Sequence, residues 1–94
     1  MPYVLIRHKV TDYDSWRPVF DDHGRAREAA GSTGGQVFQN AEDLTEVVVL
    51  LEWDSVEDAR RFIHSKDLRE AMTRSGVTDT PDMFVLEKVE DTSA

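Results

Sequence analysis

The sequence contains no cysteine. Disulfide bonds, thiolate nucleophiles and cysteine-based metal sites are therefore excluded, and this absence is typical of the reducing cytoplasm. The sequence also lacks any apolar run near the roughly 20 residues that a membrane-spanning helix requires. Its N-terminus shows no basic and apolar leader segment. We therefore expect a cytoplasmic protein that does not insert into a membrane.

Positive charge is scarce in this chain. Its 11 lysine and arginine residues are outnumbered by 19 aspartate and glutamate residues, which gives a net charge of −8. Nucleic acids and anionic membrane surfaces select for basic patches, so we expect neither as a partner. A length of 94 residues suits one domain with a single core. We predict one domain over residues 1–90 and a frayed tail over residues 91–94.

The segment 46–53, with the sequence EVVVLLEW, is the most apolar stretch, and its β-branched content indicates a strand. One face of this strand would carry Trp53 and the apolar residues that alternate with it. The other face would carry Val48 and Leu50. A strand that is apolar on both faces needs a cover on both faces. This chain has enough helix to cover only one side of a small sheet.

The flanking patterns predict further helices and strands. In chain order, the expected elements are a strand at 3–10, a helix capped by Asp14 or Ser15 and ended by Gly31, a short strand at 36–39, the long strand at 46–53, a helix capped by Asp54 or Ser55, a short helix between Ser65 and Gly76, and a strand at 83–89. A cap at Asp14 or Ser15 places Pro18 in or beside the first turn, where proline is tolerated. A helix that starts at Asp12 would be kinked by Pro18.

This order of elements is that of the ferredoxin-like βαββαβ fold, an α+β architecture. Right-handed crossovers would place the helices on one face of a four-stranded antiparallel sheet, with the second helical segment broken in two. The other face would then be bare and apolar, which marks an interaction site. We expect a second copy of the chain to cover it across a two-fold axis, so that the protein is a homodimer.

Three segments carry a resemblance to a known family: DYDSWRPVF at 12–20, LEWDS at 51–55, and residues 65–76. In these segments, and as a pattern of elements over nearly the whole chain, the sequence resembles the antibiotic biosynthesis monooxygenase-like (ABM) proteins of the dimeric α/β-barrel superfamily. The resemblance implies a dimeric barrel. It also implies a cofactor-independent monooxygenase or related enzyme that acts on a small aromatic or polyketide-like molecule. The rival is a non-catalytic binding or regulatory domain.

The superfamily also includes haem-degrading enzymes, and three of their positions can be compared. Trp53 matches their strand-end tryptophan. Met72 falls where that branch has its haem-ligating histidine, and His8 falls near its first-strand asparagine. A methionine would leave no open, imidazole-supported haem site. Haem degradation is therefore the less favoured alternative, and we expect no cofactor.

Two histidines are the candidate catalytic residues. His23 lies on the apolar stripe of the first helix, one turn after Phe20, and His8 lies on the more apolar face of the first strand. A histidine in either place could act as a general base near neutral pH, and the two could share a cavity between sheet and helices. The alternative is that each is a buried histidine with a local hydrogen-bond partner.

Four large apolar side chains are expected to line that pocket, and they are Trp16, Phe20, Trp53 and Met72. The alternative for the two tryptophans is ordinary core packing. No HxH, HxxxH or HExxH spacing occurs, so the sequence predicts no metal site. Gly34 and Gly35 are not expected to form a phosphate-binding loop, because no strand leads into them and no Lys-Ser/Thr pair follows.

Overall fold

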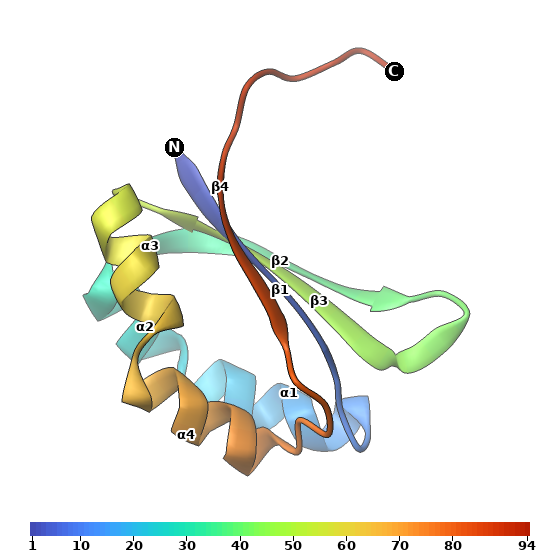
Figure 1. The fold of residues 1–94 in the computed structure, drawn as a ribbon. Coiled ribbons are helices and arrows are strands. Elements are labelled where there is room, and N and C mark those ends of the chain that lie inside the picture. Colours follow the sequence, from blue (N-terminus) through green and yellow to red (C-terminus); the bar gives the residue numbers. More distant parts are fainter.

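The helices and strands of the computed structural model, which describes residues 1–94, follow the order expected from the sequence. The elements are β1 (Pro2–Lys9), α1 (Tyr13–Asp22), α2 (Gly24–Ala30), β2 (Ser32–Asn40), β3 (Asp43–Trp53), α3 (Val56–Ile63), α4 (Lys66–Ser75) and β4 (Asp82–Glu87). No helix is long and apolar enough to cross a membrane. The four helices lie on one side of the sheet, and residues 88–94 extend beyond β4 without helix or strand (Figure 1).

All strand pairs in the sheet are antiparallel, and the strand order is β2-β3-β1-β4. The central strand β1 pairs with both β3 and β4, so that Leu5 lies opposite Leu50 on one side and opposite Phe84 on the other. This is the ferredoxin-like topology, and the predicted α+β class is confirmed.

The hydrophobic core lies between the sheet and the helices. Val47, Val49, Leu51 and Trp53 of β3 are buried on the helix side, each with 4% exposure or less. The core cluster consists of Val4, Ile6, Val10, Trp16, Val47, Val49, Leu51, Trp53, Ala59, Phe62 and Leu68. Of the two apolar faces of the long strand, the one that ends in Trp53 therefore meets the helices.

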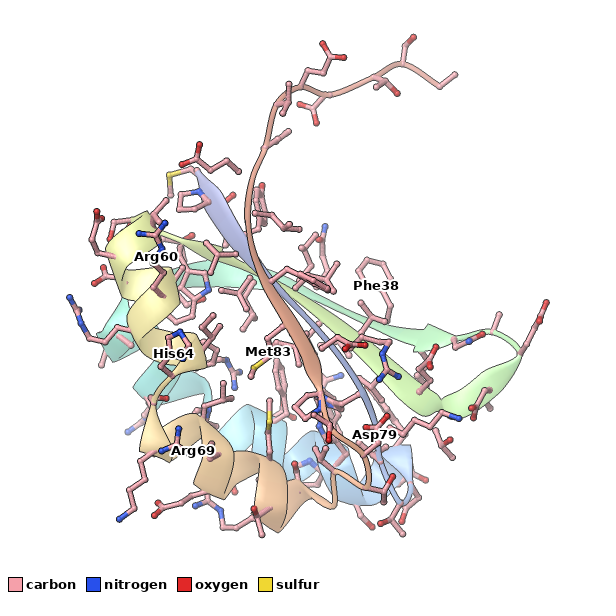
Figure 2. The ribbon with its side chains drawn as sticks, viewed as in Figure 1. Phe38, Arg60, His64, Arg69, Asp79 and Met83 are labelled. Carbon is pink, nitrogen blue, oxygen red and sulfur yellow. The ribbon has the colours of Figure 1, made fainter.

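The opposite face of the sheet has no cover. It carries an apolar set, the open-face patch, which consists of Leu5, Phe38, Val48, Leu50, Phe84 and Leu86. Phe38 is 50% exposed and Phe84 is 54% exposed, although both belong to large apolar residue types. Phe38 points away from the helices, whereas Met83 points toward them (Figure 2). The patch spans all four strands.

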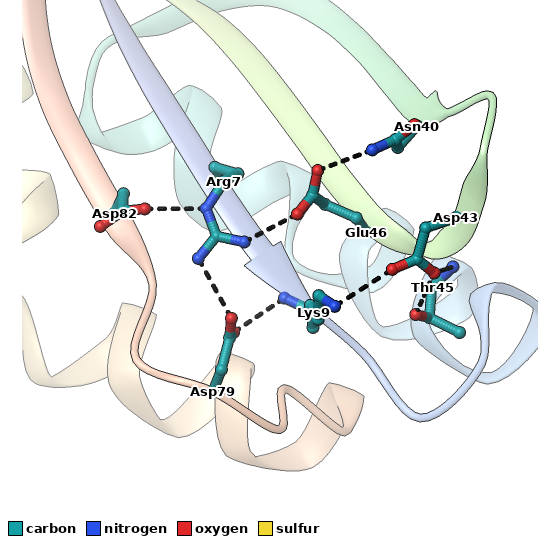
Figure 3. Close-up of polar contacts among 8 residues, drawn as sticks. All are labelled: Arg7, Lys9, Asn40, Asp43, Thr45, Glu46, Asp79 and Asp82. Atoms are coloured by element: carbon teal, nitrogen blue, oxygen red, sulfur yellow. Dashed lines mark hydrogen bonds and ion pairs between the residues drawn. The ribbon is translucent and has the colours of Figure 1, made fainter.

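One arginine on the open face joins three strands and a loop. The guanidinium group of Arg7 binds Glu46 on β3 at 3.0 Å, Asp82 on β4 at 2.8 Å and Asp79 in the loop before β4 at 3.1 Å (Figure 3). The backbone N–H of Lys9 donates to Asp79 at 2.8 Å. This bond and the nearby Arg7 hold the pKa of the Asp79 carboxyl below its ordinary value. A network of charges contributes more than isolated surface pairs.

The first helix differs from the prediction in its start and its length. Asp12, and not Asp14 or Ser15, is the N-cap, because its carboxylate accepts a bond from the backbone N–H of Ser15 at 2.8 Å. Pro18 therefore lies inside α1, which nevertheless runs on to Asp22. The single helix expected up to Gly31 is instead divided at His23, after which α2 begins.

Other boundaries agree more closely. Ser55 caps α3 and Ser65 caps α4, as expected. Gly76 ends α4 with a left-handed φ of 84°, and the N–H of Val77 bonds to the carbonyl of Met72, which confirms a Schellman ending. The second strand is longer than the predicted 36–39, because its first residues also pair with β3 around a bulge.

Candidate functional site

An internal cavity, here called the inner cavity, lies between the sheet and the helices. It has room of about 40 Å³ for the centre of a water-sized molecule, which corresponds to a few water molecules at most. Its lining consists of Ile6, His8, Trp16, Val19, Phe20, His23, Arg27, Val49, Leu51, Phe62, Leu68, Ala71, Met72 and Ser75. The walls are thus apolar apart from two imidazoles, one guanidinium and one hydroxyl group. This is the usual composition of a small-molecule site.

His8 is a buried imidazole without a hydrogen-bond partner. It is only 3% exposed, and neither Nδ1 nor Nε2 has a partner in the protein. Burial lowers the pKa of His8 to about 4, so the ring is neutral at pH 7. A buried polar group left unsatisfied costs about 1–3 kcal/mol. Such a group points to a ligand, because a neutral imidazole offers one donor and one acceptor to whatever occupies the cavity.

His23 has a carboxylate partner from another helix. Its Nε2 atom lies 2.6 Å from Oδ2 of Asp67, while the imidazole is almost fully buried and the carboxylate is 59% exposed. His23 closes the C-terminal end of α1, and Asp67 lies in the first turn of α4, where the helix dipole favours an anion. An ionised carboxylate only accepts, which assigns the proton to Nε2 and leaves Nδ1 able to accept another.

The fold thus brings the two candidate catalytic histidines to one cavity. His8 arrives from β1 and His23 from the end of α1. Their catalytic roles remain predictions. Asp67, the partner of His23, was not predictable from the sequence, because it lies 44 residues from His23. The sequence indicates only that Asp67, two residues after the Ser65 cap, lies in the first turn of a helix. His64 is exposed and lies on the outer side of the helices (Figure 2).

Three of the four expected wall residues contact the cavity. Trp16 and Phe20 stack with ring centres 4.8 Å apart, and Met72 faces them from α4. Trp53 does not line the cavity, contrary to the sequence-based expectation. Its exposure is zero, and its ring packs against Phe62 with centres 4.6 Å apart. The end of β3 is covered directly by α3, so Trp53 fills the core there.

The residues of the site do not form a metal-binding cluster. No group of three His, Asp or Glu side chains has a metal-binding arrangement. Met72 supplies a thioether where the haem-degrading branch has histidine. Of the two cavity imidazoles, His23 is held by Asp67 and His8 has no hydrogen-bond partner.

A larger open depression, here called the outer groove, adjoins the inner cavity. It holds about 720 Å³ and runs between the first two helices and β2. Phe20, Arg27 and Leu51 line both the groove and the cavity, so these side chains form the wall between them. A ligand that lies in the groove therefore reaches the two histidines only past this wall.

Comparisons with known proteins identify the fold. A scan against protein-family models finds no match, and a search of the curated proteins finds none either. Solved structures do match. A candidate antibiotic biosynthesis monooxygenase from Bordetella bronchiseptica superposes with a TM-score of 0.78 at 15% identity, over 95% of this chain and 97% of that chain.

Two further structures are similar. SnoaB, a cofactor-independent oxygenase from Streptomyces nogalater, gives a TM-score of 0.76 at 12% identity, over 99% of this chain and 97% of that chain. Rv0793 from Mycobacterium tuberculosis gives 0.67 at 16% identity, over 99% and 100%. The chain therefore has the fold of the antibiotic biosynthesis monooxygenase proteins, as the sequence resemblance implied. At such identities the likeness concerns the fold alone.

Proposed function

We propose that this protein is a cofactor-independent monooxygenase that acts on a small, electron-rich aromatic or polyketide-like phenol. One observation carries the proposal: an unpartnered neutral imidazole, His8, and a carboxylate-held imidazole, His23, face the same apolar cavity. Buried titratable groups in a cleft are typical of functional sites. The shared fold with SnoaB, a cofactor-independent oxygenase, supports this reaction class.

The two histidines take different roles in the proposed reaction. His23 is the general base, because Asp67 orients its ring and stabilises the imidazolium formed when it accepts the substrate proton. His8, whose pKa is lowered to about 4, is a weak base at pH 7 and instead donates a hydrogen bond to the oxyanion of the substrate. Both are positioning interactions as well, since they fix the substrate relative to the cavity.

The chemistry balances without an added reductant. The deprotonated substrate supplies electrons to dioxygen, one oxygen atom forms a new carbonyl group at a ring CH₂, and the other leaves as water with the two hydrogens of that CH₂. The protein removes a proton and excludes bulk water through its apolar walls. No residue needs to change its own oxidation state.

We also infer that the protein works as a homodimer joined through the open-face patch. Both edge strands contribute exposed aromatic or aliphatic side chains, with Phe38 on β2 and Phe84 on β4. A second copy packed face to face would cover them and supply the second layer that the sheet lacks.

Oxygen uptake tests the proposed activity. The protein is mixed with an anthrone-type phenol, and dioxygen is followed with an electrode while the quinone is followed by absorbance. We expect uptake and quinone in equal amounts, with a rate at least about a hundredfold lower in His23→Ala. His64→Ala is the matched control and should retain the full rate. Equal rates in His23→Ala and wild type would contradict the proposal.

The rival function is a non-catalytic binding or regulatory domain, and one observation favours it. The stacked pair Trp16–Phe20 and the tilted pair Trp53–Phe62 pack in the interior, and the inner cavity has only about 40 Å³. A domain of this kind would bind the phenol with no uptake of oxygen above the buffer rate. The same experiment therefore separates the two functions.

A further inference from the structure

The outer groove contains one positive charge, that of Arg27, that is in ion-pair contact with no carboxylate of the protein; Asp21 acts on it only from a longer distance. Arg17, at one end of the groove, is paired with Asp21 at 2.9 Å. Arg27 forms no ion pair, and its one hydrogen bond runs from Nη1 to the carbonyl oxygen of Phe20 at 2.8 Å. Glu28, the only carboxylate of the groove, is not in ion-pair contact with it. The charge of Arg27 is therefore available to an anion from outside.

The surroundings of the Arg27 guanidinium group favour the binding of an anion. The guanidinium carbon lies 3.8 Å from the centre of the Phe20 ring, so the cation lies over an aromatic face. Burial lowers the pKa of Arg27, although an arginine remains charged at any physiological pH. A half-buried cation without a counter-ion is stabilised by an anionic ligand. Its remaining nitrogens, Nε and Nη2, form a fork suited to a carboxylate.

The rest of the groove suits a flat ligand body. Gly34 and Gly35 present no side chain, and a Cβ atom at Gly35 would overlap the carbonyl oxygen of Leu50. The hydroxyl groups of Ser32 and Thr33 are already bonded to Glu52. The volume of about 720 Å³ is that of a typical small-molecule site. Arg27 is thus the group best placed to select a ligand by charge.

We propose that Arg27 is the specificity-determining residue of this site, and that the ligand is a planar aromatic molecule with an ionised carboxylate or phenolate group. The anionic group binds Arg27, and the ring system lies along the groove against Phe20. Because these two residues also line the inner cavity, the ligand is held at the wall that separates the groove from His8 and His23. This inference rests on the proposed function in that it names the substrate class of the same site.

A matched pair of probes tests the inference without catalysis. The probes are 2-naphthoate and its uncharged amide, 2-naphthamide, titrated separately into the wild-type protein. Binding is followed by backbone amide shifts in two-dimensional NMR and by quenching of Trp16, which stacks on Phe20. We expect the naphthoate to bind roughly tenfold more tightly than the amide, the usual effect of one charge-assisted hydrogen-bonded pair. The largest shifts should fall on Gly24, Gly34 and Gly35.

Two variants assign the preference to one residue. Arg27→Gln should bind both probes equally, and Arg27→Lys should keep part of the preference because it keeps the charge without the fork. Arg25→Gln, an exposed arginine on the same helix, is the control and should behave as wild type. A purely structural Arg27 would change the melting temperature of the variant without changing the ratio of the two affinities.

Three results would overturn the inference: equal affinity of the wild type for both probes, a preserved preference in Arg27→Gln, or shifts confined to residues away from the groove. The wild-type comparison decides the matter even if Arg27→Gln fails to fold. Binding is measured without turnover. A charge preference without oxygen uptake would therefore leave this inference standing while the proposed activity fails. Oxygen uptake without a charge preference would support the proposed activity and overturn the inference about Arg27.

Discussion

The Nε2 atom of His23 lies 2.6 Å from a carboxylate oxygen of Asp67, and this contact joins the end of α1 to the first turn of α4. It turns an isolated histidine on an apolar stripe into an oriented imidazole. The carboxylate of Asp67 is exposed to solvent, and the imidazole of His23 forms part of the wall of the inner cavity. A base needs both a fixed orientation and access to its substrate.

Removal of the carboxylate charge should lower activity more than stability. We predict that Asp67→Asn reduces the rate of oxygen uptake by about tenfold or more, because the ring loses its fixed tautomer and the imidazolium loses its partner. The melting temperature should change little, because the Asp67 carboxylate is 59% exposed.

The control for this prediction lies on the same helix. Glu70→Gln removes an exposed carboxylate whose contact with Lys66 is long, at 3.7 Å, and it should leave the rate unchanged. Steady-state kinetics of the two variants, together with their melting temperatures, provides the comparison. An unchanged rate of oxygen uptake in Asp67→Asn would show that the contact does not contribute to the action of the base.

Replacement of His8 by an apolar residue should stabilise the protein. His8→Leu removes two unsatisfied nitrogens from the core, and we predict a gain of about 1–3 kcal/mol in the free energy of unfolding at pH 7. Urea denaturation measures this gain. Activity should fall in the same variant, the expected result when an unsatisfied polar group is retained for function. A loss of stability in His8→Leu would indicate that the imidazole is satisfied in solution.

The pH dependence of stability gives a second test of His8. Burial lowers the pKa of His8 from 6.5 to about 4, so between these values the unfolded chain binds a proton that the folded chain does not. The free energy of unfolding should therefore fall as pH falls from about 6.5 to about 4, by up to about 1.4 kcal/mol per pH unit. In His8→Leu this part of the slope should be absent. Urea denaturation at pH 7 and pH 5 measures it.

The network around Arg7 should contribute stability at neutral pH and lose it in acid. The pKa of Asp79 is held below its ordinary value of 3.8, so its contribution is present above that value and is lost as pH falls through the folded value. Asp79→Asn should lower the urea midpoint at pH 7, and the gap from wild type should narrow below pH about 4. Glu90→Gln, in the segment beyond β4, is the control and should change neither. A difference between the urea midpoints of Asp79→Asn and wild type that widens in acid would contradict this account.

Association through the open-face patch makes a simple prediction about mass. Light scattering should report about twice the 10.7 kDa of one chain. Phe84→Glu places a charge opposite Leu5, on the β4 edge of the patch, and should shift the protein to a monomer. Arg69→Glu, which changes a side chain on the outer surface of α4, should remain a dimer (Figure 2). A wild type of 10.7 kDa would rule out the dimer.

The fold was predictable because its signals are local. The β-branched apolar run of β3, the serine caps of α3 and α4, and the glycine at position 76 each specify structure within a few residues. The break at His23 was not predictable, because an apolar stripe continues across it at helical spacing. The N-cap at Asp12 was also not predictable, because several residues of 11–15 have side chains that can cap a helix.

The candidate site was only half predictable. Periodicity places His8 and His23 on inward faces, but it does not say which tertiary partners meet them. Asp67 comes from another helix, and the missing partners of His8 are a property of the packed core. Trp53 is a second example of a residue whose direction, but not whose neighbours, could be predicted from periodicity. An inward-facing tryptophan lines a pocket or fills the core according to what packs on it, and here Phe62 does.

Isotope labelling tests the central claim most directly. The reaction of an anthrone-type phenol is run under isotopically labelled dioxygen, and the quinone is examined by mass spectrometry for wild type and for the His8→Ala, His23→Ala double variant. We predict one labelled oxygen atom per quinone with the wild type, formed well above the rate without protein, and only the protein-free rate with the double variant. Undiminished formation of labelled quinone by the double variant would contradict the account.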